Sequence, residues 1–138
     1  MLKLLAELDL THELVIDSAG TAGHHTGERP DPRTLKAANS RGITLPSRAR
    51  RFEHADFARF DYVLAMDEQN RDDLLRLARS DQERDKVHLL LSFSAEPSAP
   101  SEVPDPYYGG AAGFEHVLDL CDSACRGFVE HLRRTHGF

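Results

Sequence analysis

The run Tyr62-Val63-Leu64-Ala65-Met66-Asp67 carries the clearest fold signal in the chain. Its apolar residues 62–65 predict a short buried strand, and Asp67 is a typical N-cap for an amphipathic helix that we expect to extend to about residue 79. A second apolar run, residues 87–91, predicts the strand that follows this helix. Strand, helix and strand in this order indicate a parallel sheet of the doubly wound α/β type.

Further elements are expected on both sides of this unit. The helix that begins with Asp31 as cap and Pro32 at its first position should close at Arg41-Gly42. The other expected elements are a helix at residues 1–10, a strand at 14–17, a loop at 19–27, a short helix at 53–60 and a long helix at about 113–134. A chain of 138 residues with 40% hydrophobic content should form one domain, residues 1–138.

Composition excludes several classes of function. The net charge of −6 argues against general nucleic-acid binding, although Arg48, Arg50 and Arg51 form one local basic cluster. The apolar run at residues 1–8 is too short to span a membrane. The two cysteines lack the spacing of a disulfide framework, which favours a reducing compartment, and we expect a cytoplasmic protein.

The loop between residues 92 and 110 is long for a compact domain, which favours a functional role. It contains Val103-Pro104-Asp105-Pro106-Tyr107-Tyr108-Gly109-Gly110. Two prolines restrict the backbone around Asp105 and so fix the direction of its carboxylate, while Tyr107 and Tyr108 provide flat surfaces that suit the wall of an aromatic-ligand site. An ordinary turn uses the same residue types, so the residues alone leave both interpretations open.

The motif Asp-Pro-Tyr-Tyr-Gly at residues 105–109 resembles that of the low-molecular-weight protein-tyrosine-phosphatase family. Matching segments follow the family order at residues 15–21, 30–33, 41–43, 48–50, 60–67 and 70–74. The resemblance covers residues 1 to about 136. It implies a three-layer, doubly wound parallel sheet of the phosphotyrosine phosphatase I type, a phosphotyrosine protein or aryl phosphate as substrate, and no cofactor or metal.

The same resemblance implies roles for individual residues. Asp105 would be the general acid and base, and Tyr107 and Tyr108 would contact the substrate. His24 stands where the family commonly has an aromatic residue at the mouth of the site. Ser18 would support the phosphate-binding loop, and so would Ser47, where family members often carry His.

The family nucleophile is the feature that the chain lacks. Family members attack phosphorus with the thiolate of a Cys-x5-Arg-Ser/Thr loop that joins the first strand to the first helix. Six residues after Cys121 comes Gly127, and six after Cys125 comes His131, so neither cysteine begins this motif. Their spacing on a helix predicts two small apolar residues on one buried face, not a redox or metal site.

The first strand and the phosphate loop of the family are thus absent from the 138 residues. We expect an N-terminally incomplete domain, from a misplaced start or a genuinely short form, that is inactive alone and folds poorly or aggregates because a central strand is missing. A non-catalytic interaction protein, or pseudophosphatase, is the main alternative. An arsenate reductase of the same fold is less favoured because residues 62–85 contain no cysteine. The oligomeric state stays open.

Overall fold

A computed structural model of the chain describes residues 1–10, 13–21, 27–29, 31–43, 50–94, 100–104 and 110–137. The elements in this part are α1 (Leu2–Glu7), α2 (Pro32–Ser40), α3 (Asp56–Arg59), β1 (Val63–Ala65), α4 (Glu68–Leu77), α5 (Asp81–Arg84), β2 (Val87–Leu89), the 3-10 turn η1 (Leu90–Phe93) and α6 (Gly110–His136). Strands β1 and β2 pair in parallel, with Val63 opposite Val87 and Ala65 opposite Leu89. This pairing confirms the expected parallel α/β arrangement.

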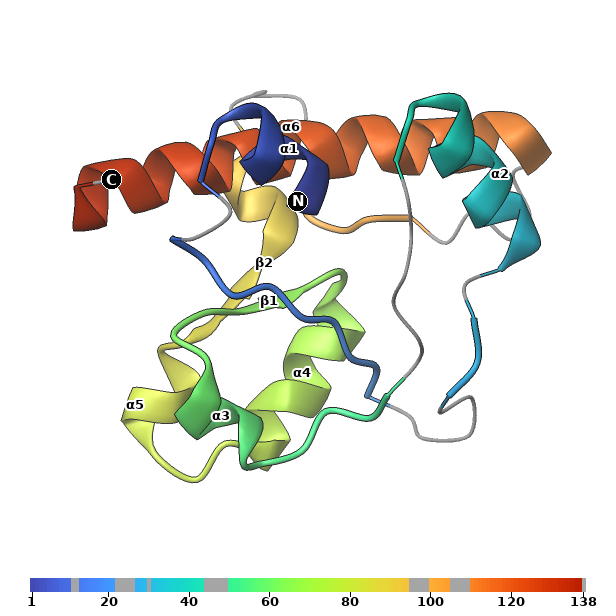
Figure 1. Cartoon of the computed structure of the whole chain (residues 1–138). Helices are drawn as coiled ribbons and strands as arrows, with labels where there is room; N and C mark the ends of the chain where they lie inside the picture. Colours follow the sequence, from blue (N-terminus) through green and yellow to red (C-terminus); the bar gives the residue numbers. More distant parts are fainter. Residues whose placement is uncertain are drawn as a thin grey trace.

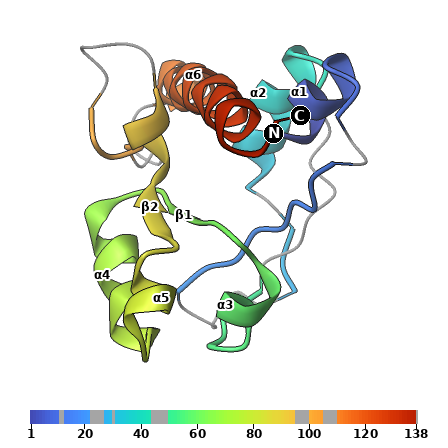
Figure 2. The same ribbon diagram turned by 90° about the vertical axis from the view of Figure 1, so that its left-hand side faces the viewer.

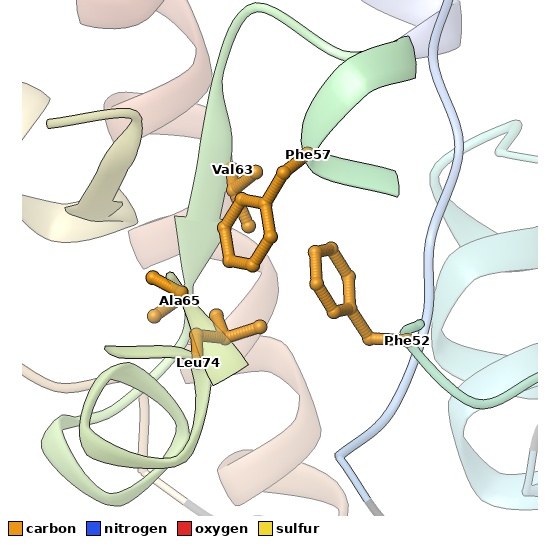
Figure 3. Packing of buried hydrophobic residues seen from close by; sticks show 6 residues of the cluster. Phe52, Phe57, Val63, Ala65 and Leu74 are labelled. Carbon is orange, nitrogen blue, oxygen red and sulfur yellow. The ribbon is translucent and has the colours of Figure 1, made fainter. Parts of the chain in front are cut away.

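Helices lie on both faces of the strand pair, so the molecule has three layers (Figures 1 and 2). Alternation along β1 explains this, because successive side chains of a strand point to opposite faces. Val63 and Ala65 pack in one cluster with Leu74 of α4 (Figure 3). Leu64, between them, packs instead against the cluster that contains Ala124 of α6. Each face of β1 is therefore covered by a helix.

The buried side chains form three clusters, each held between different elements. The first joins Phe52, Phe57, Val63, Ala65, Leu74 and Ala78, and its two phenylalanine rings meet edge to face at 5.1 Å. The second joins Leu4, Leu5 and Leu10 to Val129 of α6. The third joins Leu90, Leu91, Leu120 and Ala124. Helix α6 contributes to the second and third clusters and so holds the N-terminal helix and the η1 turn together.

Both predicted helix caps are confirmed. The Asp31 carboxylate accepts a hydrogen bond from the Arg33 N–H at 2.8 Å, and Pro32 follows as the first helical residue. The Asp67 carboxylate accepts from the Asn70 N–H at 2.7 Å. Each bond satisfies one of the amide groups that a helix leaves unpaired in its first turn.

The prediction of a strand at residues 14–17 is wrong. The stretch lies in the described part of the chain but has no ladder partner there, and Val15 is 85% exposed. Among the described residues, an isolated parallel bridge between Gly20 and Arg51 follows it. The residue types favour a strand, but a strand is defined by the neighbour to which it bonds.

Several predicted boundaries were too long. Helix α1 ends at Glu7 because Asp9 adopts a positive φ of 56°, and α3 covers only Asp56–Arg59 of the expected 53–60. Strand β2 stops at Leu89, after which the chain tightens into η1. Helix α5 was not predicted, although the Ser80 hydroxyl caps it by accepting from the Glu83 N–H at 3.2 Å. In the described part of the chain, no helix is both long and apolar enough to cross a membrane.

Candidate functional site

The carboxyl end of β1 leads directly into the N-terminus of α4. Met66 follows the strand, Asp67 caps the helix, and Glu68 is its first residue. In open α/β sheets, ligands bind beyond the carboxyl ends of the strands. This edge is therefore where the sequence placed the candidate site.

Residues 100–104 are attached to the same edge. The Val103 N–H donates to the Met66 carbonyl at 2.8 Å, and the Glu68 N–H donates to the Glu102 carboxylate at 3.2 Å. The Val103 side chain packs against the cluster that contains Leu90 and Leu91. The chain is thus held at the end of β1 two residues before Asp105.

Five of the six predicted site residues lie outside the described residues: Asp105, Tyr107, Tyr108, His24 and Ser47. Ser18 is described, and it lies exposed just after the 14–17 stretch. Its N–H donates to the Asp17 carboxylate at 2.8 Å. The roles suggested for all six residues remain predictions.

Arg50 connects the Ser18 region to the body of the molecule. Its Nε donates to Asp17 Oδ2 at 3.1 Å, and its Nη1 donates to Asp56 Oδ2 at 3.0 Å. The Asp56 side chain is only 1% exposed, and its Oδ2 also accepts from the Glu53 N–H at 2.9 Å. The guanidinium is therefore shared by two carboxylates, and Arg50 is not available as a basic residue of an open anion site.

The charges in this network are mutually stabilised. Burial raises the pKa of Asp56, but the hydrogen bonds from Arg50 and from the Glu53 N–H outweigh it, so the net pKa lies below its usual value. The hydrogen bond to Asp56 raises the pKa of Arg50. The sequence showed Arg50 only as part of a basic cluster. Nothing in the local pattern marked Asp56 as buried, because that depends on tertiary packing.

Both cysteines lie half-buried on α6. Cys121 packs against the cluster of Leu90 and Leu91, and Cys125 against that of Leu5. Burial raises the pKa of the Cys121 thiol to about 11 and also raises the pKa of Cys125. A thiol that attacks phosphorus needs the opposite shift, so the packing supports the expectation that these cysteines are apolar side chains of the core.

No group of three His, Cys, Asp or Glu side chains within the described ranges is arranged to hold a metal ion.

Comparisons with known proteins show the family to which this chain is similar. The profile of low molecular weight phosphotyrosine protein phosphatases matches residues 1–137. A putative low molecular weight protein-tyrosine-phosphatase of Synechocystis is 43% identical over 87% of this chain and 76% of its own length. The corresponding phosphatase of Streptomyces coelicolor is 41% identical over 90% of this chain and 76% of its own.

Solved structures agree with the fold. A protein tyrosine phosphatase from Entamoeba histolytica superposes with a TM-score of 0.92 at 36% identity, covering 97% of this chain and 85% of that protein. The chain belongs to the low molecular weight protein-tyrosine-phosphatase family.

Proposed function

We propose that the domain to which this chain belongs hydrolyses phosphotyrosine monoesters through a cysteinyl-phosphate intermediate, with Asp105 as general acid and base. Tyr107, Tyr108 and His24 would contact the phosphoryl-bearing ring, and Ser18 and Ser47 would support the phosphate loop. The substrate would be a phosphotyrosine protein or an aryl phosphate, and the cytoplasm would be the compartment. No metal or cofactor takes part in the proposed steps.

The proposed reaction has two steps. A cysteine thiolate forms a bond to phosphorus while the bond from phosphorus to the phenolic oxygen breaks, and Asp105 gives its proton to the leaving oxygen. A water molecule then attacks the phosphocysteine and gives a proton to the Asp105 carboxylate, so that inorganic phosphate leaves and the thiolate is restored. Electrons and protons balance over the two steps, with water as the one added reactant.

The observation that best supports this proposal is the attachment of residues 100–104 to the end of β1. The hydrogen bond from Val103 to Met66 brings the chain just before Asp105 to the edge where this class of fold binds ligands. Asp105 follows Val103 by two residues and stands between Pro104 and Pro106 in the sequence, which is the basis for expecting its carboxylate at this edge.

We further propose that the 138 residues are inactive on their own, because neither Cys121 nor Cys125 has the environment of an attacking thiolate. The purified chain should give no vanadate-sensitive hydrolysis of p-nitrophenyl phosphate. Iodoacetamide should modify Cys121 roughly 100-fold more slowly in the native chain than in the unfolded chain near neutral pH, because fewer thiols are ionised. Vanadate-sensitive hydrolysis that disappears in Cys121→Ser or Cys125→Ser would contradict this proposal.

The role of Asp105 can be tested in a protein that carries this chain together with a Cys-x5-Arg-Ser/Thr loop. Replacement Asp105→Ala should lower kcat on phenyl phosphate by about 10²–10⁴-fold, the usual contribution of a general acid. The loss should be smaller on p-nitrophenyl phosphate, whose leaving group needs less protonation. Asp61→Ala, which alters an exposed aspartate before β1, serves as control, and an unchanged kcat in Asp105→Ala would remove Asp105 from the mechanism.

A second candidate is a non-catalytic interaction protein. The exposure of Val15, in a stretch that has no ladder partner among the described residues, favours it, since open edges of this kind add to the sheets of other chains. The phosphatase assay and a measurement of self-association separate the two candidates.

A further inference from the structure

The stretch that carries Ser18 has few polar connections to the rest of the described molecule. Leu14 and Ile16 pack toward the cluster of Leu4 and Leu5, whereas Asp17 and Ser18 are exposed. Apolar packing alone tolerates sliding along a helix surface better than directed bonds do. The position of Ser18 therefore depends on the polar contacts that follow Ile16.

Those contacts converge on residues 50–52. The Gly20 N–H donates to the Arg50 carbonyl, and the Phe52 N–H donates to the Gly20 carbonyl, each at 2.8 Å. The Arg50 guanidinium meets Asp17 on the same side, with Nη2 to Oδ2 at 3.0 Å. Backbone and side chain of one residue thus hold both ends of the 17–20 stretch.

The two aspartate partners of Arg50 differ in burial. Asp56 is 1% exposed, whereas Asp17 is 47% exposed. The buried pair with Asp56 fixes the direction of the Arg50 guanidinium. Asp56 Oδ1 accepts a hydrogen bond from Arg50 Nη2, and Asp56 Oδ2 accepts one from the Glu53 N–H, so the carboxylate has little room for another arrangement. The Nε and Nη2 groups of the planar guanidinium then point at Asp17.

We propose that Arg50 is a positioning residue, which holds the 17–20 stretch and with it Ser18 against residues 50–52 through Asp17 and Asp56. Asp56 orients the Arg50 guanidinium, and the guanidinium in turn holds Asp17 of the 17–20 stretch. Only the chemical role of Ser18 in this account rests on the proposed function. The attachment itself is a property of the fold.

Hydrogen exchange of single amides in the 138-residue chain, at micromolar concentration, tests this attachment. In Asp17→Asn the Gly20 and Phe52 amides should exchange about two- to fivefold faster, the effect expected for a half-exposed ion pair. The Val63 amide donates to the Lys86 carbonyl at 2.9 Å, at the start of the β1–β2 pair. Its exchange rate should not change. Arg50→Lys keeps the charge but loses the fork, so it should accelerate the same two amides.

Salt and a matched variant provide the controls. About 1 M NaCl should accelerate the Gly20 and Phe52 amides of the wild type and have little further effect in Asp17→Asn, because salt screens exposed charges. Asp122→Asn removes an aspartate of similar exposure, 56%, that pairs with Arg126 on α6 at 3.1 Å, and it should leave both amides unchanged. Unchanged exchange in Asp17→Asn, or an equal acceleration at Val63, would overturn the proposal.

Activity separates this proposal from the proposed function. In a protein that carries this chain together with a Cys-x5-Arg-Ser/Thr loop, Asp17→Asn should lower kcat on p-nitrophenyl phosphate and leave KM within about twofold, because the loop is supported during chemistry and not at substrate binding. Absence of hydrolysis by that protein without the substitution counts against the proposed function, and the exchange rates of the 138-residue chain still decide on Arg50. If Asp17→Asn accelerates exchange of the Gly20 and Phe52 amides but leaves kcat unchanged, Ser18 has no part in catalysis, and the attachment of the 17–20 stretch by Arg50 still holds.

Discussion

His88 is a residue whose protonation should oppose the native fold. It lies on β2, with its ring 6.1 Å from that of Tyr62 and 5.7 Å from that of Phe93. Burial and the neighbouring His131 lower its pKa, and Asp85 opposes this effect only in part. The native state therefore favours the neutral imidazole.

The free energy of unfolding should consequently fall under mildly acidic conditions. Histidine in an unfolded chain has a pKa of about 6.5, and the pKa of His88 in the native state is lower. As the pH falls through about 6.5, the unfolded chain therefore binds more protons than the native protein, and the free energy of unfolding decreases. Urea midpoints at about pH 7.5 and about pH 5.5 should differ in the wild type and differ less in His88→Gln. His116→Gln, at an exposed site on α6, should keep the wild-type difference, and an NMR titration of His88 at or above the usual pKa would contradict the prediction.

The residues that could be predicted from the sequence are those whose partners are close in the chain. Asp31 and Asp67 cap helices through amides two and three residues away, so the local pattern was sufficient. Arg50 meets Asp17, 33 residues earlier, and the long loop anchors on Met66 through Val103. Such pairings depend on how distant segments pack, which no local spacing encodes.

At the scale of elements, α6 approaches η1 closely enough to need a glycine. A Cβ built on Gly127 would lie 1.7 Å from the Phe93 carbonyl oxygen, a backbone atom that cannot turn aside as a side chain can. Ring contacts lie on the same interface, with Phe93 and Phe128 centroids 5.0 Å apart. The close approach of helix and turn therefore lies beside the third cluster, in which Leu90 and Leu91 of η1 pack with Leu120 and Ala124 of α6.

Gly127→Ala should destabilise the protein even though alanine is the better helix former. The added methyl group must separate α6 from η1, which we expect to cost about 1–3 kcal/mol, more than the gain in helix propensity of about 1 kcal/mol. Thermal unfolding followed by circular dichroism should show a Tm lower by roughly 3–10 °C. Glu130→Ala, at an exposed position of the same helix, should remain near the wild-type Tm, and a raised Tm in Gly127→Ala would show that the contact is looser than described.

At this scale, the prediction was right for the β1–α4–β2 unit and wrong for the 14–17 stretch. The β1–α4–β2 unit followed from its apolar runs and the Asp67 cap, because each part carries its own signal. The 14–17 stretch had an equally good strand composition, yet the described structure gives it no ladder partner. Composition sets what a segment can form, and the availability of a neighbour decides whether it does.

For the whole molecule, the division of the core into three clusters leaves some apolar side chains exposed, and Val15 is the most exposed of the large ones that the structure describes. Val15 is 85% exposed, between Leu14 and Ile16, which pack inward. Residues 14–17 make no backbone hydrogen bond within the described part of the chain. An unpaired extended stretch with an exposed β-branched side chain is a typical site for edge-to-edge association.

We predict that the chain self-associates as its concentration rises and that Val15→Lys reduces this association. A charged side chain on an open edge disfavours the approach of a second strand. Light scattering across a concentration series should show the difference. Leu77→Lys, at an exposed leucine that belongs to helix α4 and not to an open edge, should behave like the wild type, and equal association in both variants would place the contact elsewhere.

The contact between α1 and α6 has a consequence for synthesis on the ribosome. Leu4 and Leu5 are buried against Val129, so α1 finds this partner only after the ribosome has made α6. Synthesis of the stretch between Leu5 and Val129 at about 5–20 residues per second takes roughly 6–25 s. A helix of six residues does not persist alone. The leucines of α1 therefore remain open to chaperones during this interval, and α1 becomes ordered long after it has been synthesised.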